Sequence, residues 1–302
     1  MENFALIGVF VVLGMFFRRL PAFPKDSAQA FNIFALYVSL PAVILLKVPQ
    51  IVFSPEVAIA AAIPWGMLAF SAALVLLAAR LSGWERSVTG VLLLVVPLGN
   101  TSFLGIPMIQ AFFGPSGLPY LIIYDQIGTM VIMATYGSFI LATYGKQGAL
   151  NLSAVARKAV LFPPTLALIV GLATRSWPYP EKLVQCLQSV ATTLVPVVMT
   201  AIGLQLRFRL PPRVFTPLAF GLTVKLLLAP LLALLVCRFL EVNGMVVDVS
   251  ILESAMPPMV TAGALAVVAG MDSDLAVAMI GIGIILSFGT IPTIYWLTRL
   301  FA

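Results

Sequence analysis

Long apolar stretches separated by short polar segments run along the whole chain. A bilayer core about 30 Å thick needs about 20 apolar residues per helix, and the sequence offers about ten such stretches. They cover residues 3–19, 28–48, 56–80, 87–113, 117–143, 154–174, 181–205, 215–239, 246–269 and 274–300. The pattern therefore predicts an all-α polytopic membrane protein with ten transmembrane helices.

Two short segments break the fourth and ninth stretches. The first covers residues 97–102 and is followed by Gly105 and Pro107, and the second covers residues 253–258. Proline and glycine end helices and leave main-chain N–H and C=O groups without partners. Lipid cannot satisfy those groups, so such a break persists only inside protein or beside a polar cavity. One break in each half of the chain indicates the binding site of a transporter.

The two halves of the chain carry matching landmarks. Pro41 and Pro196 lie 155 residues apart, and the two breaks are separated by nearly the same offset. Five spans per half make the second copy enter the membrane from the opposite side. We therefore predict two inverted five-helix repeats, residues 1–150 and 151–302, an architecture common among secondary transporters. The alternative is a chance alignment of prolines in two apolar halves.

Composition excludes a soluble globule. The chain is 61% hydrophobic and 9% charged, whereas soluble domains carry about a quarter charged residues. There is no histidine, which excludes histidine-based catalysis. The two cysteines, Cys186 and Cys237, lie far apart in apolar stretches, so their spacing indicates neither a metal site nor a disulfide framework.

The positive charge gives the orientation. The net charge is +6, and the excess cations fall in short loops, which is typical of membrane topology and not of nucleic-acid binding. With the N-terminus outside, eleven basic residues face the cytoplasm and five the exterior. The cytoplasmic set is Arg18, Arg19, Lys25, Arg80, Arg86, Lys146, Arg157, Lys158, Arg207, Arg209 and Arg213. We predict a multi-pass protein of the cell membrane with both termini extracytoplasmic.

Three ionisable residues lie well inside predicted spans: Asp125, Lys225 and Glu253. Such residues are functional candidates by default. A carboxylate beside unwound carbonyls and hydroxyls makes a hard-oxygen site suited to Na⁺. Six residues are predicted to converge there if the two breaks cross, namely Asn100, Thr101, Ser102, Asp125, Thr129 and Glu253. The alternatives are proton transfer by the carboxyl groups, or a structural ion pair of Lys225 with one of them.

The breaks also suit an anion. Half-helices that begin after a break point their positive ends at the membrane centre. The predicted substrate-binding residues are Asn100, Thr101, Ser102, Met256, Pro257, Pro258 and Lys225. Hydroxyl and amide donors at the first break would equally suit a neutral ligand. We expect a small organic anion as substrate and no cofactor apart from Na⁺ as a coupling ion.

Other functional classes fit less well. An intramembrane aspartyl protease needs a Gly-x-Gly-Asp partner for Tyr124-Asp125, but Gly281-Ile282-Gly283 is followed by Ile284. A channel needs a continuous polar stripe, and the spans hold isolated polar residues instead. A primary pump needs a nucleotide-binding loop. The sequence therefore predicts a carrier and no enzyme.

Three stretches resemble one family of membrane transporters, the auxin efflux carriers. They are residues 36–42 (LYVSLPA), 99–107 (GNTSFLGIP) and 255–260 (AMPPMV), and the resemblance extends over essentially the whole chain. It implies ten helices in two inverted repeats, a fold shared with bile acid sodium symporters, in which helices four and nine cross. It also implies an elevator mechanism, with a scaffold from helices 1, 2, 6 and 7 and a mobile core from helices 3–5 and 8–10.

The resemblance also implies ligands. Plant members export the auxin anion, and bacterial members are associated with malonate and other organic acids. The short loop between spans five and six is similar to the bacterial type. The related bile acid symporters bind sodium at the crossing, which implies the same role for Asn100, Asp125, Thr129 and Glu253, whereas plant auxin carriers do not use sodium. A homodimer through the scaffold helices is implied as well.

Overall fold

The computed structural model describes residues 2–24, 26–51, 55–146, 161–206 and 212–301. Every regular element within these ranges is helical, and the extended residues form a single isolated bridge. The all-helical prediction is therefore confirmed for the described chain. Contacts divide the protein into two units that interleave along the sequence.

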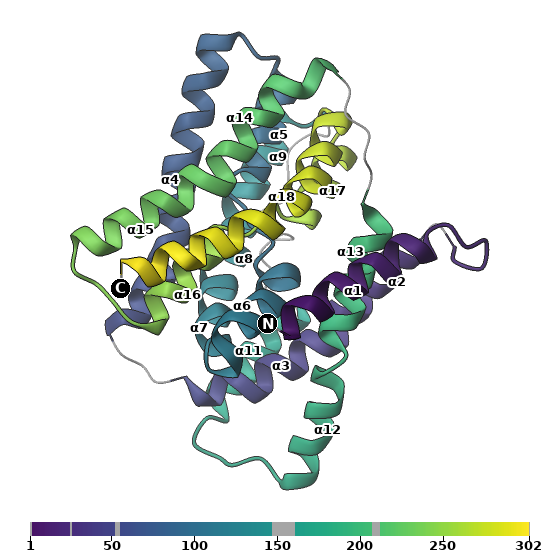
Figure 1. Ribbon diagram of the computed structural model, residues 1–302, viewed down its shortest axis with the longest axis vertical. Helices are drawn as coiled ribbons and strands as arrows, with labels where there is room; N and C mark the ends of the chain where they lie inside the picture. Colours follow the sequence, from purple (N-terminus) through teal and green to yellow (C-terminus); the bar gives the residue numbers. More distant parts are fainter. Residues whose placement is uncertain (1, 25, 52–54, 147–160, 207–211, 302) are drawn as a thin grey trace. The chain divides into compact units, whose positions relative to one another are not determined.

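Unit 1 comprises residues 1–53, 102–122 and 157–206. Its main helices are α1 (Glu2–Phe17), α2 (Ser27–Phe34), α3 (Leu40–Lys47), α6 (Ile106–Phe113), α7 (Leu118–Ile123), α11 (Pro163–Ala173), α12 (Glu181–Ala191) and α13 (Leu194–Gln205). Helices α1 and α13 lie side by side (Figure 1). Gly14 and Gly203 meet at their contact, because small residues let two helix backbones approach closely.

Unit 2 comprises residues 54–101, 123–156 and 207–302. Its main helices are α4 (Pro55–Ser82), α5 (Arg86–Val95), α9 (Ser138–Tyr144), α14 (Phe215–Thr223), α15 (Ala229–Phe239), α16 (Met245–Ser254), α17 (Val260–Val268) and α18 (Ser273–Leu300). The buried helix α5 packs against α4, α9, α17 and α18. The start of α18 is fixed by Asp272, whose side chain accepts a hydrogen bond from the Leu275 N–H at 2.9 Å, as expected of an N-cap.

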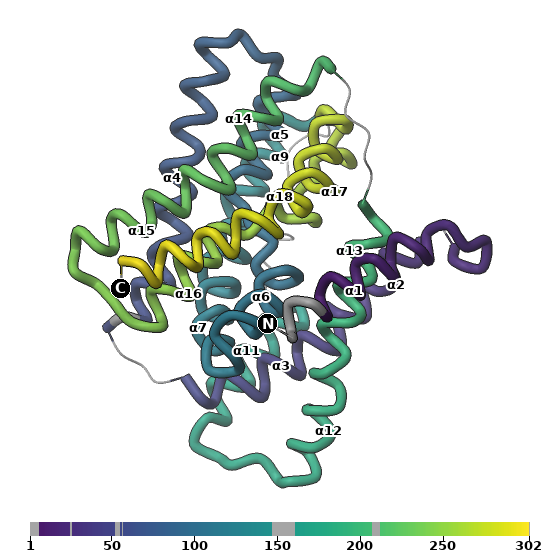
Figure 2. The backbone as a smooth tube through the Cα atoms, in the orientation of Figure 1, coloured from purple at the N-terminus to yellow at the C-terminus, as the bar shows by residue number. Residues whose placement is uncertain are grey.

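Within the described ranges, six helical segments are long and apolar enough to cross a membrane. They cover Ser27–Gln50, Val57–Ser82, Leu118–Tyr144, Glu181–Gln205, Pro212–Phe239 and Ser273–Leu300. Shorter apolar helices are Leu6–Phe17, Arg86–Val95 and Pro163–Ala173. The fourth predicted span is divided into α5 and α6. The ninth is divided into α16 and α17, and Figure 2 labels all four helices along the backbone.

Parts of the sequence-based topology fall outside the described residues. These parts are the repeat boundary at 150/151, residues 154–160 of the predicted span 154–174, and five of the predicted cytoplasmic basic residues, Lys25, Arg157, Lys158, Arg207 and Arg209. The division into two inverted repeats stays a prediction.

Several spans contain π-helical turns, in which hydrogen bonds run from i to i+5. They are η1 (Ala35–Ser39), η3 (Thr101–Gly105), η5 (Tyr124–Thr129), η6 (Met133–Gly137) and η8 (Val224–Leu228). Such turns are rare and occur frequently at functional sites. Asp125 lies in η5 and Lys225 in η8, so two of the three ionisable candidate residues lie in π-helical turns.

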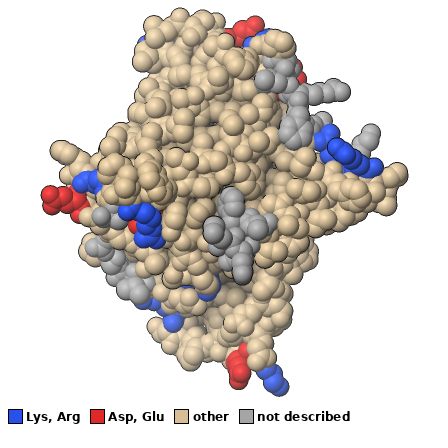
Figure 3. All heavy atoms as spheres, in the orientation of Figure 1, with Lys and Arg blue, Asp and Glu red and all other residues tan. Residues whose placement is uncertain are grey.

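Apolar side chains cover much of the surface. The face drawn in Figure 3 shows few charged groups, and large exposed side chains include Phe139, Leu235 and Phe239. A soluble monomer rarely exposes so many large apolar side chains. This surface is what lipid contact requires.

Candidate functional site

The two breaks meet through residues that belong to unit 2. Gly99 and Pro258 form an antiparallel bridge. On either side of it, the Asn100 N–H donates to the Pro257 carbonyl at 2.7 Å, and the Met259 N–H donates to the Leu98 carbonyl at 2.9 Å. Each break thus satisfies main-chain groups that the other leaves open, which is the condition for an irregular backbone at membrane depth.

A cation lies beside this bridge. A Cβ atom placed on Gly99 would be 3.1 Å from the Lys225 Nζ, so the ammonium packs against the backbone of the first break. The same Nζ donates to the Ser254 carbonyl at 3.3 Å. Ser254 is the last residue of α16, and carbonyl groups at the end of a helix favour a positive charge. Lys225 therefore contacts both breaks.

A carboxylate, that of Asp125, also contacts the first break. Asp125 is buried and accepts two hydrogen bonds from neighbouring side chains. The Thr101 hydroxyl donates to its Oδ1 at 2.5 Å, and the Gln126 amide donates to its Oδ2 at 2.7 Å. These bonds hold the Asp125 carboxylate of η5 beside Thr101, the residue that follows Asn100.

Four buried polar atoms near the crossing have no hydrogen-bond partner among the described residues. They are the Asn100 Nδ2, the Gln126 Oε1 and both carboxyl oxygens of Glu253. A buried polar group without a partner costs free energy, so each such atom indicates a ligand, an ion or a proton. The donor is on the first break, and the Glu253 acceptors lie at the end of α16, just before the second break. Glu253 interacts electrostatically with Asp125 and Lys225.

The other predicted site residues are placed as follows. Met256, Pro257 and Pro258 are buried in the second break. Thr129 is buried in η5, four residues after Asp125. Ser102 is buried and begins a stretch of unit 1. The polar contact that the structure gives for Lys225 is with the Ser254 carbonyl, and the structural ion pair with a carboxyl group stays an alternative.

Two residues of this cluster were not predicted from sequence. Gln126 orients Asp125, and a second polar residue beside Asp125 in an apolar span was the available signal. Ser254 contributes its carbonyl group to Lys225, and a main-chain acceptor has no sequence signal of its own. Its place at the end of a broken helix is the only hint.

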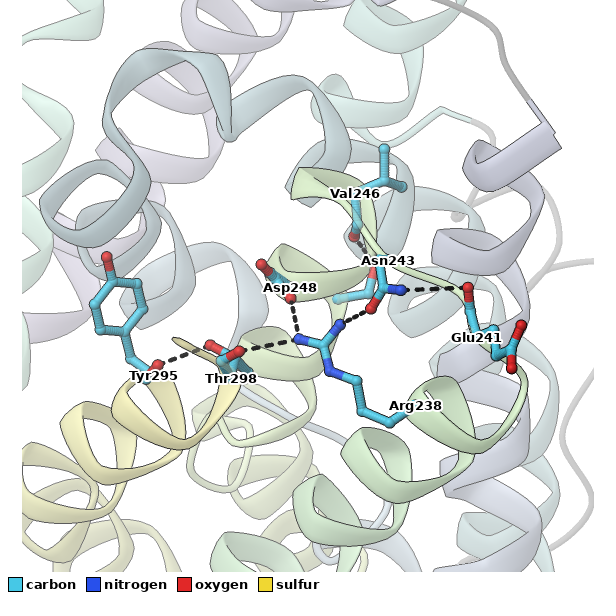
Figure 4. Close-up of polar contacts among 8 residues, drawn as sticks. Arg238, Glu241, Asn243, Val246, Asp248, Tyr295 and Thr298 are labelled. Carbon is cyan, nitrogen blue, oxygen red and sulfur yellow. Dashed lines mark hydrogen bonds and ion pairs between the residues drawn. The ribbon is translucent and has the colours of Figure 1, made fainter. Parts of the chain in front are cut away.

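A second polar network fixes the start of α16 (Figure 4). Arg238, near the end of α15, donates to the Asp248 carboxylate at 3.1 Å and to the Thr298 carbonyl at 3.0 Å. It also donates to the Asn243 side chain. The guanidinium thereby joins the ends of α15 and α18 to the first turn of α16, the helix that carries Glu253 at its other end.

Broken helices that exchange main-chain hydrogen bonds around a buried lysine and two buried carboxyl groups define a membrane transporter. Comparison with known proteins gives the same class. A family model described as membrane transport protein matches residues 1–295. The chain belongs to this family, that of the auxin efflux carriers that it resembles in sequence.

Two archaeal proteins are similar over most of their length. An uncharacterized transporter of Methanothermobacter thermautotrophicus is 27% identical over 300 residues, which cover 96% of each chain. An uncharacterized transporter of Methanocaldococcus jannaschii is 23% identical over 274 residues, which cover 85% of each chain. Both proteins are named as transporters, and neither name states a substrate.

Proposed function

We propose that this protein is a secondary transporter of a small organic anion and that the crossing of the two breaks is its binding site. The proposal includes ten helices in two inverted repeats, in the cell membrane, with both termini extracytoplasmic, and an elevator-type movement of a core against a scaffold. The observation that carries the proposal is the unpaired Asn100 Nδ2 beside the bridge that Lys225 contacts.

The anion is proposed to bind through donors of both breaks. The Asn100 amide supplies a neutral N–H donor with no present partner. Lys225 supplies a charge-assisted donor, and such bonds are roughly twice as strong as neutral ones. The α-helix α17 begins at Val260 directly after the second break, and the N–H groups of a first turn have no partner within the helix. These three donor types favour a carboxylate over a cation or an apolar ligand.

The coupling ion is proposed to act at the carboxyl groups. Among the described residues, the Glu253 oxygens have no hydrogen-bond partner. A proton on Glu253, or Na⁺ held by Glu253 together with Asp125 and Thr129 of η5, would compensate their burial. Na⁺ coupling is the first candidate. Uniport without an ion is the second, because the Lys225 ammonium already brings a positive charge to the crossing.

Uptake into proteoliposomes tests this function. Labelled malonate and labelled indole-3-acetate would be offered with a Na⁺ gradient, with a pH gradient and with neither. We expect uptake of at least one anion, its loss in Asn100→Ala, and loss of ion dependence in Asp125→Asn and Glu253→Gln. Unchanged uptake in Asn100→Ala would refute the crossing as the anion site. If uptake depends on neither gradient and both carboxyl variants keep the wild-type rate, the protein works as a uniporter without a coupling ion.

A further inference from the structure

A cavity of about 560 Å³ lies within unit 1, and its lining includes none of the residues at the crossing of the two breaks, namely Asn100, Thr101, Asp125, Lys225 and Glu253. Its wall comes from α1, α3, α6, α12 and α13, and every residue that lines it belongs to unit 1. The volume falls within the range of small-molecule sites, which are mostly apolar with a few polar groups that fix orientation. Ile7, Phe10 and Val43 are part of the apolar wall.

Five polar residues line the cavity. Two of them use their donors locally, since the Gln50 amide donates to the Leu46 carbonyl and the Thr192 hydroxyl to the Ser189 carbonyl. The other three are Lys47, Gln110 and Gln188. Lys47 and Gln110 are half-buried, and Gln188 is exposed. Among the described residues, none of these three side chains has a hydrogen-bond or ion-pair partner. One cation and two amide groups therefore face an apolar cavity with their donors unused.

The position of Lys47 explains why a charge is stable there. It lies in the last turn of α3, and a helix C-terminus favours a cation. Its half-buried surroundings make an uncompensated charge costly and strengthen its attraction for an anion compared with open water, so a bound anion would stabilise the ammonium. A single cation beside two amides matches one carboxylate, and the apolar wall matches an apolar body.

We infer that this cavity is a second binding site of the transporter, which takes a small carboxylate with an apolar body. Lys47 pairs with the carboxylate, and Gln110 and Gln188 donate to its oxygens. The ligand class rests on the proposed function, because both sites would take organic anions. The two sites share no residue, because the cavity is lined by residues of unit 1, whereas Asn100, Asp125, Lys225 and Glu253 belong to unit 2.

The test measures binding of phenylacetate to the purified full chain in phosphatidylcholine nanodiscs. An Asn100→Ala background removes the unpaired donor of the crossing. We expect phenylacetate to bind in that background, and Lys47→Gln to weaken binding at least tenfold. Phenylacetamide, which lacks the charge, and malonate, which lacks the apolar body, should each bind at least tenfold more weakly than phenylacetate.

Matched variants keep the test decisive. Lys182→Gln removes an exposed lysine of the same unit that does not line the cavity, and it should leave binding unchanged. Lys47→Arg keeps the charge and should restore binding, whereas Gln188→Trp, at an exposed position, should block it. Equal affinities of Lys47→Gln and Lys182→Gln would overturn the proposal.

A lipid could supply the same chemistry, so the binding assay is repeated in phosphatidylglycerol nanodiscs. Unchanged affinity supports a small free carboxylate as the ligand. Loss of phenylacetate binding there, with Lys47 dependence retained in phosphatidylcholine, would show that anionic lipid holds the site and would overturn the proposed ligand. Transport by Asn100→Ala decides the function of the crossing independently of all these results.

Discussion

The ammonium of Lys225 lies 3.3 Å from the carbonyl oxygen of Ser254, the last residue of α16. A helix that ends inside a membrane leaves carbonyl groups without partners, and here a side chain from the π-helical turn η8 supplies a donor. The same ammonium packs against Gly99 in the other break. One residue thus stabilises the broken end of a helix and places positive charge where the two breaks meet.

Replacing Lys225 by Met should remove both effects. We expect transport to fall at least tenfold and thermal stability to decrease, because the Ser254 carbonyl loses a charged hydrogen-bond donor, a contact of about 1.5–3 kcal/mol. Proteoliposome uptake and a thermal melt of the purified protein measure the two effects. Lys182→Met, at an exposed position, is the control. Wild-type transport by Lys225→Met would show that the crossing needs no fixed cation.

Thr101 is expected to orient Asp125 through its hydroxyl group, which lies 2.5 Å from the Oδ1. Thr101→Val keeps the shape of the side chain and removes the donor. The ion concentration that gives half-maximal uptake should therefore rise at least tenfold, while the protein still folds. Thr101→Ser retains the hydroxyl and should behave like the wild type. An equal response of both variants would mean that the hydroxyl group has no part in ion binding.

Arg238 and Arg213 offer a comparison of buried and exposed ion pairs. Arg238 and Asp248 have exposed side-chain fractions of 16% and 8%, whereas Arg213 is 64% exposed beside Asp272 and Asp274. Arg238→Gln should lower the free energy of unfolding by about 1.5–3 kcal/mol, the typical contribution of a hydrogen bond to a charged group.

Arg213→Gln is the matched control for this comparison. It should have little effect, because exposed ion pairs contribute little. Thermal melts of both variants in one detergent measure the difference. Equal melting temperatures would argue against Arg238 as the residue that anchors α16.

Some of this architecture can be predicted from the sequence, and the rest cannot, for physical reasons. Pro97 and Pro257 mark the breaks because proline cannot continue a helix, and Asp125 and Glu253 stand out because charge is costly in lipid. The contact of Lys225 with Ser254 spans 29 residues and ends on a main-chain carbonyl, which no side-chain pattern reports. The π-helical turn around Lys225 also shifts the helical phase, so regular periodicity does not predict the direction of its side chain.

The interleaving of the two units is likewise absent from the hydrophobic pattern. The break at residues 97–102 coincides with a change of unit, since Thr101 belongs to unit 2 and Ser102 to unit 1. Hydropathy reports only burial in an apolar medium, which is the same for both units. Which helices pack together depends on side-chain shape, and glycine positions are the nearest sequence signal of it.

Gly14 and Gly203 provide the sharpest test of that packing. A Cβ on Gly14 would come within 2.9 Å of the Gly203 Cα, and a Cβ on Gly203 would come equally close to the Gly14 Cα. Backbone atoms cannot move aside as a flexible side chain can, so α1 and α13 would have to separate. Gly14→Val or Gly203→Val should therefore lower the free energy of unfolding by about 1–3 kcal/mol, the usual cost of overpacking.

Gly8→Val is the matched control, because Gly8 lies on the same helix α1 and a Cβ there has no neighbour within 4 Å. It changes helix propensity in the same way as Gly14→Val but adds no contact with α13. Thermal melts of the three variants separate the two effects. A drop in melting temperature for Gly8→Val as large as for Gly14→Val would show that propensity, and not the close approach of α1 and α13, sets the stability of unit 1.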